Sequence, residues 1–309
     1  MSKKIQIKID ASAMKKSACS RYLYLNVIEG LKPRGIKDMS LHYGSSIHKF
    51  CETYVQTGDM VNSMIATHAY YRKDTPPEGG SKDWLTINHL TSSCGVLKDW
   101  IDRDTNVEYM INSKDGSKLC EVRLALPIFV SEDVEVLLCG TIDKIVRFKR
   151  GAICIGDYKT TSTYKKDDYF VQYRLDPQMM TYRFMLEWCA KNKVGGILEE
   201  IGSQKIGCFF DAIFLSKTKD TEVSRSTVMF HSDSDMLQYE MLLMQLVHKL
   251  VQFGVTKARP LKEGMVNGSC THLYGACQYF GLCSAPDATS EQMMIRNYFE
   301  QREYNPLNY

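Results

Sequence analysis

The segment that most constrains this chain is residues 140–159, GTIDKIVRFKRGAICIGDYK. Within it, two runs of β-branched, apolar and aromatic residues, VRF and AICIGDY, flank a turn that ends in glycine, which predicts a β-hairpin. Side chains alternate between the faces of a strand, so we expect Asp157 and Lys159 on one face, where Asp143 of the partner strand can meet them. Two carboxylates beside an ammonium suit a divalent cation and phosphodiester hydrolysis.

Charge and hydropathy set limits on the partners of the chain. Its 309 residues suit one large domain, and the formal net charge of +3 gives no argument from global charge for a nucleic-acid partner. No apolar run is long enough to span a bilayer, and the start, MSKKIQIKID, lacks the apolar core of a signal peptide. We therefore expect a cytoplasmic protein with no membrane partner.

Three of the eleven cysteines stand apart from the rest. Cys270, Cys277 and Cys283 lie in a glycine-punctuated, turn-rich stretch at 267–287 without helical or strand periodicity. Such thiols are poor core residues and good metal ligands in a compartment where disulfides are rare. We interpret a further set, in apolar or mixed patterns, as small buried hydrophobes: Cys51, Cys94, Cys120, Cys139, Cys154, Cys189 and Cys208.

Hydrophobic periodicity predicts an α/β domain in which helices precede and follow a mixed sheet. The expected helices are 11–30, 42–57, 60–73, 84–104, 167–192, 235–254 and 290–302. The expected strands are 107–112, 118–130, 135–148, 152–160, 206–216 and 225–231.

Several polar residues in these elements have both a structural and a functional interpretation. His48 and Glu52 share one face of a helix, and His48 is either a half-buried histidine or the nitrogen ligand of a mixed metal site. Gln178 and Tyr182 are also four apart and could be a surface pair. We interpret Glu121, which opens the strand EVRLALPIF, as a solvent-facing glutamate.

The motifs together are more specific than any one of them. In chain order they are CSRY from Cys19, GSSIH (44–48) with Glu52, GTID (140–143), DYKT (157–160), QMMTY (178–182) and the three late cysteines. This set resembles the RecB-type branch of the PD-(D/E)XK nuclease superfamily. The resemblance covers residues 14–285 and is strongest to its iron–sulfur members, which include the Cas4-like and AddB-like DNA exonucleases and many phage relatives.

The resemblance implies a restriction-endonuclease-like core, with a central mixed β-sheet flanked by helices and a cysteine-stapled N- and C-terminal helical region. It predicts a single nuclease domain over 1–309. Within that domain, 11–105 is a helical region with Cys19 and His48, 106–231 is the catalytic sheet core, and 232–309 holds the C-terminal helix and the cysteine loop.

The same resemblance assigns roles to the motif residues. His48, Asp143, Asp157 and the backbone carbonyl of Tyr158 would bind Mg²⁺ or Mn²⁺, and Lys159 would orient or activate the attacking water. Gln178 and Tyr182 would position nucleic acid or the lysine, and Thr160 and Thr161 would add hydrogen bonds to phosphate. Basic and aromatic residues near the motifs are further candidate DNA contacts, although each could equally lie on a solvated helix face: Arg21, Tyr22, Lys165, Lys166, Tyr169, Tyr173 and Arg174.

The resemblance also implies that Cys19, Cys270, Cys277 and Cys283 hold a [4Fe–4S] cluster. One departure counts against it: six residues separate Cys270 from Cys277, where cluster-bearing members commonly place two. Four cysteines also satisfy zinc, so a zinc site and an unmetallated loop remain alternatives.

The expected function is a metal-dependent DNA exonuclease acting on single-stranded DNA or DNA ends, in recombination, repair or phage DNA processing. One alternative is a cleavage-dead or weakly active DNA-binding subunit of a recombination complex, and another is a non-nuclease metal–thiolate interaction module. The chain has no phosphate-binding GKT or GKS motif, so a helicase or recombinase would be a separate partner. A phage-encoded member would act in the host cytosol.

Overall fold

The computed structural model describes residues 4–35, 38–73, 82–163, 166–194, 205–272 and 275–307. The chain forms two compact units. We call residues 36–123 and 141–232 the central unit, and residues 1–35, 124–140 and 233–309 the terminal unit. Two strands pass from one unit into the other: β4 (Cys120–Val130) and β5 (Val134–Phe148).

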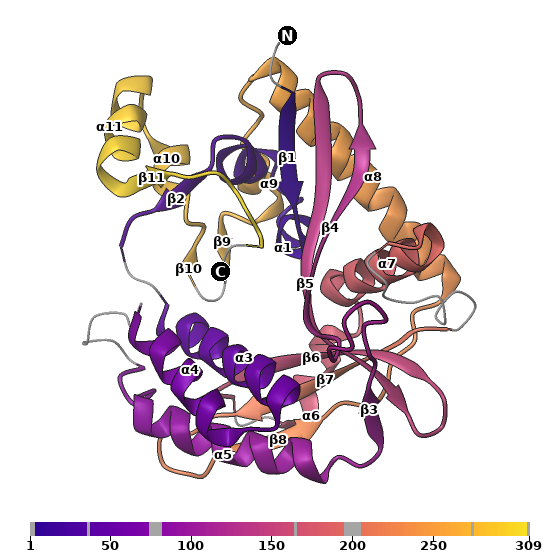
Figure 1. The fold of residues 1–309 in the computed structure, drawn as a ribbon. Coiled ribbons are helices and arrows are strands. Elements are labelled where there is room, and N and C mark those ends of the chain that lie inside the picture. The colour runs from indigo at the N-terminus through magenta and orange to yellow at the C-terminus, as the bar shows by residue number, and fades with distance from the viewer. Residues whose placement is uncertain are drawn as a thin grey trace. The chain divides into compact units, whose positions relative to one another are not determined.

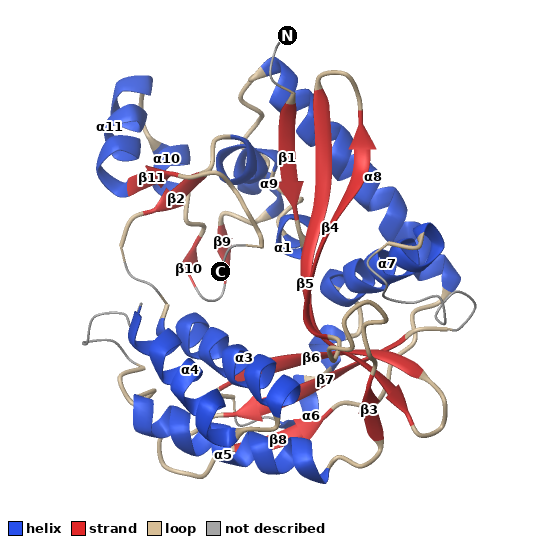
Figure 2. Ribbon diagram, in the orientation of Figure 1, coloured by secondary structure: helices blue, strands red, loops and turns tan. Residues whose placement is uncertain are grey.

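The central unit is built on a mixed sheet (Figure 2). The C-terminal half of β5 pairs antiparallel with β6, which pairs parallel with β7, which pairs antiparallel with β8. A short strand, β3, pairs with β5. The predicted hairpin between β5 and β6 is confirmed, and Gly151 adopts the positive φ of 90° that its turn requires. The bounds of these strands are β3 (Val107–Tyr109), β6 (Ile153–Thr161), β7 (Gly207–Phe214) and β8 (Glu222–Arg225).

Helices flank this sheet, as the sequence predicts. Tyr43 and Ile47 of α3 pack with Tyr158 and Ile213 of the sheet in one buried cluster. Helix α3 therefore covers the face of the sheet to which Tyr158 points. Because neighbouring residues of a strand face opposite ways, the side chain of Asp157 points to the other face. The helices are α3 (Met39–Thr57), α4 (Met60–Lys73), α5 (Ile87–Arg103), α6 (Lys166–Tyr169) and α7 (Pro177–Asn192), with a 3₁₀ turn at Val171–Tyr173.

A buried ion cluster supports the middle of the sheet. Lys144 donates to Asp211, and Arg225 donates to both oxygens of Asp211 at 2.7 Å. Although burial raises the pKa of Asp211, these two cations hold it below its usual value. Gly156 lies opposite Lys144, and a Cβ there would meet the Lys144 side chain and lie 2.5 Å from Phe209. Gly156 therefore makes room for the buried lysine directly before Asp157.

The terminal unit contains the remaining described elements. The short strand β1 pairs parallel with the N-terminal half of β5, with Ile5 opposite Val134. No helix in the described ranges has the length and apolarity needed to cross a membrane. The elements are β1 (Ile5–Ile9), α1 (Ala11–Lys15), α2 (Ser20–Leu23), a π-helical turn (Tyr24–Ile28), β2 (Leu31–Pro33), α8 (Asp233–Thr256), α9 (Gly264–Asn267), β9 (Thr271–His272), β10 (Gly275–Ala276), α10 (Phe280–Ser284), α11 (Ala288–Tyr298) and β11 (Phe299–Gln301).

Segments from both ends of the chain lie side by side in this unit, where β2 pairs antiparallel with β11 (indigo and yellow in Figure 1). Nη2 of Arg21 lies 3.1 Å from Oε1 of Glu291, and the Tyr279 hydroxyl donates to the Leu31 carbonyl at 2.6 Å. Gly30 has a φ of 62°, and a Cβ there would overlap the carbonyl oxygen of Arg302. The first and last segments of the chain are thus joined by direct protein contacts.

Several predicted elements are wrong in extent. The helix predicted at 11–30 is interrupted, because Cys19 has extended backbone angles. The helix predicted at 167–192 is also broken, and α7 begins only after Asp176, which caps the N–H of Gln178. The predicted strand at 225–231 is an overextension, since β8 ends at Arg225 and only an isolated bridge pairs Met229. The helix predicted at 290–302 gives way to β11, and β1 and β2 were not predicted.

Candidate active site

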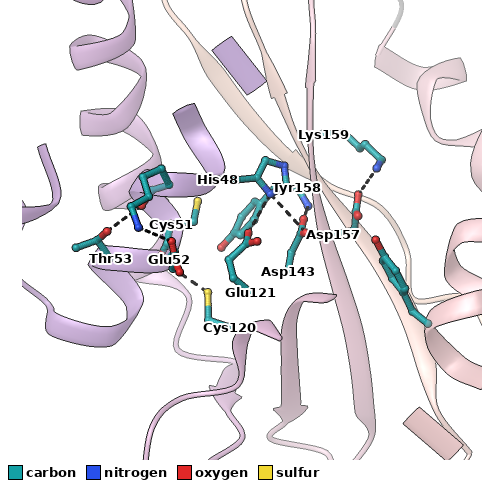
Figure 3. A network of polar contacts seen from close by, with 12 residues as sticks. His48, Cys51, Glu52, Thr53, Cys120, Glu121, Asp143, Asp157, Tyr158 and Lys159 are labelled. Atoms are coloured by element: carbon teal, nitrogen blue, oxygen red, sulfur yellow. Dashed lines mark hydrogen bonds and ion pairs between the residues drawn. The ribbon is translucent and has the colours of Figure 1, made fainter. Parts of the chain in front are cut away.

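A histidine and two carboxylates meet where α3 faces the start of β4 and the middle of β5 (Figure 3). Nδ1 of His48 lies 3.0 Å from Oε1 of Glu121 and 3.4 Å from Oδ1 of Asp143. One donor atom from each residue lies within 4.8 Å of the others. The carboxylates are nearly buried and the imidazole is 30% exposed, so the three donors form a compact site that solvent reaches from the histidine side.

Glu121 is the site residue that the sequence interpretation missed, and its assignment as a solvent-facing glutamate is wrong. Its side chain is 11% exposed and accepts a hydrogen bond from His48. Its φ is 51°, a left-handed conformation that costs about 1–3 kcal/mol for a non-glycine residue. This left-handed residue interrupts the in–out alternation of side chains along β4 and directs the Glu121 carboxylate to His48. No sequence pattern marks this conformation.

Asp157 and Lys159 lie on the α7 side of β6. Nζ of Lys159 is 2.6 Å from Oδ2 of Asp157 and donates to Oε1 of Gln178 at 3.0 Å. Nε2 of Gln178 donates to Oδ1 of Asp157 at 2.8 Å and to the Tyr182 hydroxyl at 3.0 Å. The amide of Gln178 therefore bridges the Asp157 carboxylate and the Lys159 ammonium. The Tyr182 hydroxyl accepts a hydrogen bond from the same amide.

Asp143 connects the two groups. Its Oδ2 accepts a hydrogen bond from the backbone N–H of Tyr158 at 2.6 Å, while Oδ1 faces His48. Since Tyr158 lies between Asp157 and Lys159 on β6, this bond fixes the Asp143 carboxylate beside the DYK segment. The structure thus brings together His48, Asp143, Asp157, Lys159, Gln178 and Tyr182, all six of which the sequence nominates.

The ionisable groups of the site perturb one another strongly. Burial disfavours the charged imidazolium, but the charges of Asp143 and Glu121 raise the pKa of His48 well above its usual value. Burial raises the pKa of Asp157 to about 6 and also raises that of Glu121. Burial opposes charge on Lys159 too, yet Asp157 and Asp143 raise its pKa. Lys159 is therefore an ammonium at neutral pH, which suits it to donate to an anion rather than to accept a proton.

The donor set fits a divalent cation. Two carboxylates and an imidazole are oxygen and nitrogen ligands of the kind that Mg²⁺ and Mn²⁺ accept, and together they carry two negative charges when His48 is neutral. Without a metal, the proton on His48 balances part of that charge. Asp157 lies beside this set, where its Oδ1 accepts a hydrogen bond from Gln178 and its Oδ2 faces the Lys159 ammonium at 2.6 Å without a hydrogen bond from the described residues.

The other nominated residues are placed less uniformly. Glu52 pairs with Lys49 at 2.7 Å, on the face of α3 that also carries His48. Thr160 and Thr161 are half-buried at the end of β6. Arg21, a candidate DNA contact, is buried, with its side chain 8% exposed and paired with Glu291.

Tyr169 and Tyr173, two of the candidate DNA contacts near α6, belong to an aromatic group on the face of the sheet that carries Asp157 and Lys159. The ring centroids of Tyr173 and Phe210 are 4.4 Å apart, and Tyr169 packs against Tyr173 and Phe214. Among the other candidates, Tyr22 is half-buried against Tyr279, Arg174 is exposed, Lys165 lies outside the described residues, and the side chain of Lys166 is also outside them.

The four nominated cysteines gather within the terminal unit. A Cβ placed on Gly264 would lie 2.9 Å from Sγ of Cys270 and 3.4 Å from Sγ of Cys19. Burial raises the pKa of the Cys277 thiol, and the Cys19 and Cys270 thiols raise it further; burial likewise raises that of Cys283, with Cys19 and Cys277 nearby. All four are free thiols. Their sulfurs are less compact than the His48 site, which is the set within the described ranges whose donors all lie within 4.8 Å.

Comparisons with known proteins assign the family. The model of the PD-(D/E)XK nuclease superfamily matches residues 14–284. No curated protein matches the chain. A crystal structure from Eubacterium rectale described as a "Putative exonuclease" is 15% identical, with 79% of this chain and 80% of that chain covered and a TM-score of 0.43. The crystal structure of SSO0001 is 13% identical, with 77% and 84% covered and a TM-score of 0.30.

The family model spans nearly the whole chain and includes every residue of the His48–Glu121–Asp143 set and of the DYK segment. On that match, this chain belongs to the PD-(D/E)XK nuclease superfamily.

Proposed function

We propose that this protein is a metal-dependent DNA exonuclease that hydrolyses single-stranded DNA or DNA ends. The observation that carries the proposal is the meeting of His48, Glu121 and Asp143 within 4.8 Å of one another, with Asp143 bonded to the backbone between Asp157 and Lys159. Phosphodiester hydrolysis can use a cation site next to a charged lysine, since both groups stabilise negative charge on the phosphate.

His48, Glu121 and Asp143 would hold Mg²⁺ or Mn²⁺, and Asp157 and the Tyr158 carbonyl are the further ligands that the family resemblance implies. When bound, the cation supplies Lewis-acid stabilisation of phosphoryl oxygens and lowers the pKa of water. His48 must give up its proton to act as a ligand.

Lys159 is the group of this chain that acts on the substrate. Its side chain is 23% exposed, and its ammonium can donate to a phosphate oxygen or to the attacking water while it remains beside Asp157. Gln178 restrains both Asp157 and Lys159, so the donor is held before the substrate arrives. This preorganisation is the role we propose for Gln178 and Tyr182.

The direct test is digestion of single-stranded oligonucleotides labelled at the 5′ or the 3′ end, with Mg²⁺, Mn²⁺ or EDTA. We expect loss of label that requires the metal, and release of mononucleotides from one end. Asp157→Ala should abolish cleavage while the protein stays folded, and Asp99→Asn, an exposed carboxylate on α5, should leave it unchanged. DNA binding without metal-dependent cleavage by the wild type would instead favour the DNA-binding subunit.

For the cysteines we propose a [4Fe–4S] cluster held by Cys19, Cys270, Cys277 and Cys283. The gathering of the four thiols near one another supports a shared metal site, and the family resemblance favours the iron–sulfur cluster over zinc. The cluster would reinforce the junction of the first and last chain segments. Anaerobic protein should contain iron and labile sulfide, about four of each per chain; stoichiometric zinc would contradict the proposal.

The biological setting is proposed from the resemblance alone. Recombination, repair or phage DNA processing, with a separate helicase or recombinase to supply single strands, fits a nuclease without a motor motif. Co-purification with such a motor, followed by faster digestion of duplex ends, would test it.

A further inference from the structure

A pocket opens in the central unit at the C-terminal end of β6, where Thr160 and Thr161 form part of its wall. Its volume is about 230 Å³. Leu85 and Leu215 form its apolar part. The polar lining comes from Ser40, Lys82, Thr160, Thr161 and Ser162, and the indole of Trp84 is its aromatic part.

The lining has the chemistry of an anion site beside an aromatic surface. Lys82 donates to the Ser162 hydroxyl at 2.5 Å, which leaves two ammonium N–H groups for a ligand. Of the described residues that line the pocket, none carries a carboxylate, and Lys82 is the cation among them. Nζ of Lys82 also lies 5.6 Å from the centroid of the Trp84 ring. A ligand with a phosphate next to a flat ring would match both features.

The pocket lies close to the active site in the chain. Thr160 and Thr161 of its lining directly follow Lys159 on β6, and Ser40 lies about two turns before His48 on α3. Thr160 faces α3, as Tyr158 does, because a Cβ on Gly44 would lie 3.1 Å from its Oγ1, whereas Lys159 faces the α7 side of the sheet. The pocket is therefore next to the His48 side of the active site, at the end of β6.

We propose that this pocket binds one nucleotide of the substrate strand, with the phosphate on Lys82 and the hydroxyls of Thr160 and Ser162 and the base against Trp84. The inference rests on the proposed nuclease function and adds to it a nucleotide subsite next to the cleaved bond. The shape and polarity of the pocket select a phosphorylated nucleotide over a nucleoside. The aromatic contact favours no particular base, because every base has a flat face.

Binding can be measured without catalysis. The chain has three tryptophans, and Trp84 alone remains after Trp100→Phe and Trp188→Phe. In EDTA, deoxyadenosine 5′-monophosphate should quench its fluorescence saturably, inorganic phosphate should compete, and deoxyadenosine should bind at least tenfold more weakly. Lys82→Ala should weaken mononucleotide binding at least tenfold, and the isosteric Thr160→Val should weaken it severalfold. Lys114→Ala, an exposed lysine on the β3–β4 turn, is the matched control and should have no effect.

Steady-state cleavage of a short oligonucleotide gives the second readout. Lys82→Ala should raise KM at least tenfold with kcat within twofold of wild type, and Lys114→Ala should leave both unchanged. Quenching in a protein that cleaves no DNA would overturn the proposed function and retain the pocket. Cleavage by the wild type with unaltered KM and unaltered quenching in Lys82→Ala would overturn the pocket and retain the nuclease. Equal binding of nucleoside and nucleotide would also refute it.

Discussion

Metal binding at the His48 site should depend steeply on pH. The pKa of His48 is raised well above its usual value by Asp143 and Glu121, so at neutral pH the metal-free protein carries a proton there. A metal ligand must be the neutral imidazole, and each metal bound therefore releases that proton. The sign follows directly: affinity rises as pH rises toward the pKa of His48 and levels off above it.

The magnitude is that of one displaced proton. Between pH 6.5 and pH 7.5 the apparent affinity for Mn²⁺ should rise by up to about tenfold, or about 1.4 kcal/mol, the limit for one displaced proton. Asp157, with a pKa of about 6, is already mostly ionised over this range and adds little. Below pH 6 its protonation would add a second proton and a steeper slope.

Isothermal titration calorimetry with Mn²⁺, in pairs of buffers that differ in ionisation enthalpy, counts the protons released. We expect about one per metal at pH 7. His48→Gln should flatten the pH dependence, and His68→Gln, which alters a histidine of α4 that contacts Thr91, should retain it. Equal Mn²⁺ affinity at pH 6.5 and 7.5 in the wild type, or a full slope in His48→Gln, would refute the reasoning.

Three further predictions concern the framework of the site. Asp211→Asn leaves two buried cations with a neutral partner and should lower the free energy of unfolding by about 3 kcal/mol. The control Asp99→Asn, in an exposed pair, should lower it by less than about 1 kcal/mol. Equal denaturation midpoints for the two variants would contradict this. Gly156→Ala should destabilise the protein by about 1–3 kcal/mol, because the added Cβ would meet Phe209. Gly95→Ala, where the Cβ would enter open space on α5, should stabilise it by about 0.5–1 kcal/mol. Thermal melts that rank the two variants the other way would contradict the packing argument. Gln178→Leu should lower kcat about 10- to 100-fold with little change in the melting temperature, and an unchanged kcat would show that its bridge is dispensable.

The local chemistry of the site could be predicted from sequence because it follows from short-range geometry. The hairpin that carries Asp157 and Lys159 is marked by strand alternation and a glycine turn, and Gln178 lies four residues before Tyr182 on one helix face. These relations need no knowledge of the distant chain. The start of α7 and the strand β1 were missed although local signals mark them: Asp176 followed by Pro177 is an N-cap and first-turn signal, and IQIKI alternates as a strand does.

The other missed features depend on long-range packing or on a rare backbone conformation. Glu121 faces His48 only because its backbone is left-handed, and strand alternation alone would turn it to solvent. Lys144, Asp211 and Arg225 are charged residues in strands, which sequence reasoning places on a surface. Only the fold brings them together, at a sequence separation of 67 residues between Lys144 and Asp211.

The most direct test of the account is to locate the metal. A crystal of the protein with Mn²⁺, measured for anomalous scattering, should show a peak within about 2.0–2.6 Å of ligand atoms of His48, Glu121 and Asp143. A peak elsewhere in the molecule, or none at this site under conditions where the enzyme cleaves DNA, would contradict the claim that these side chains form the metal centre.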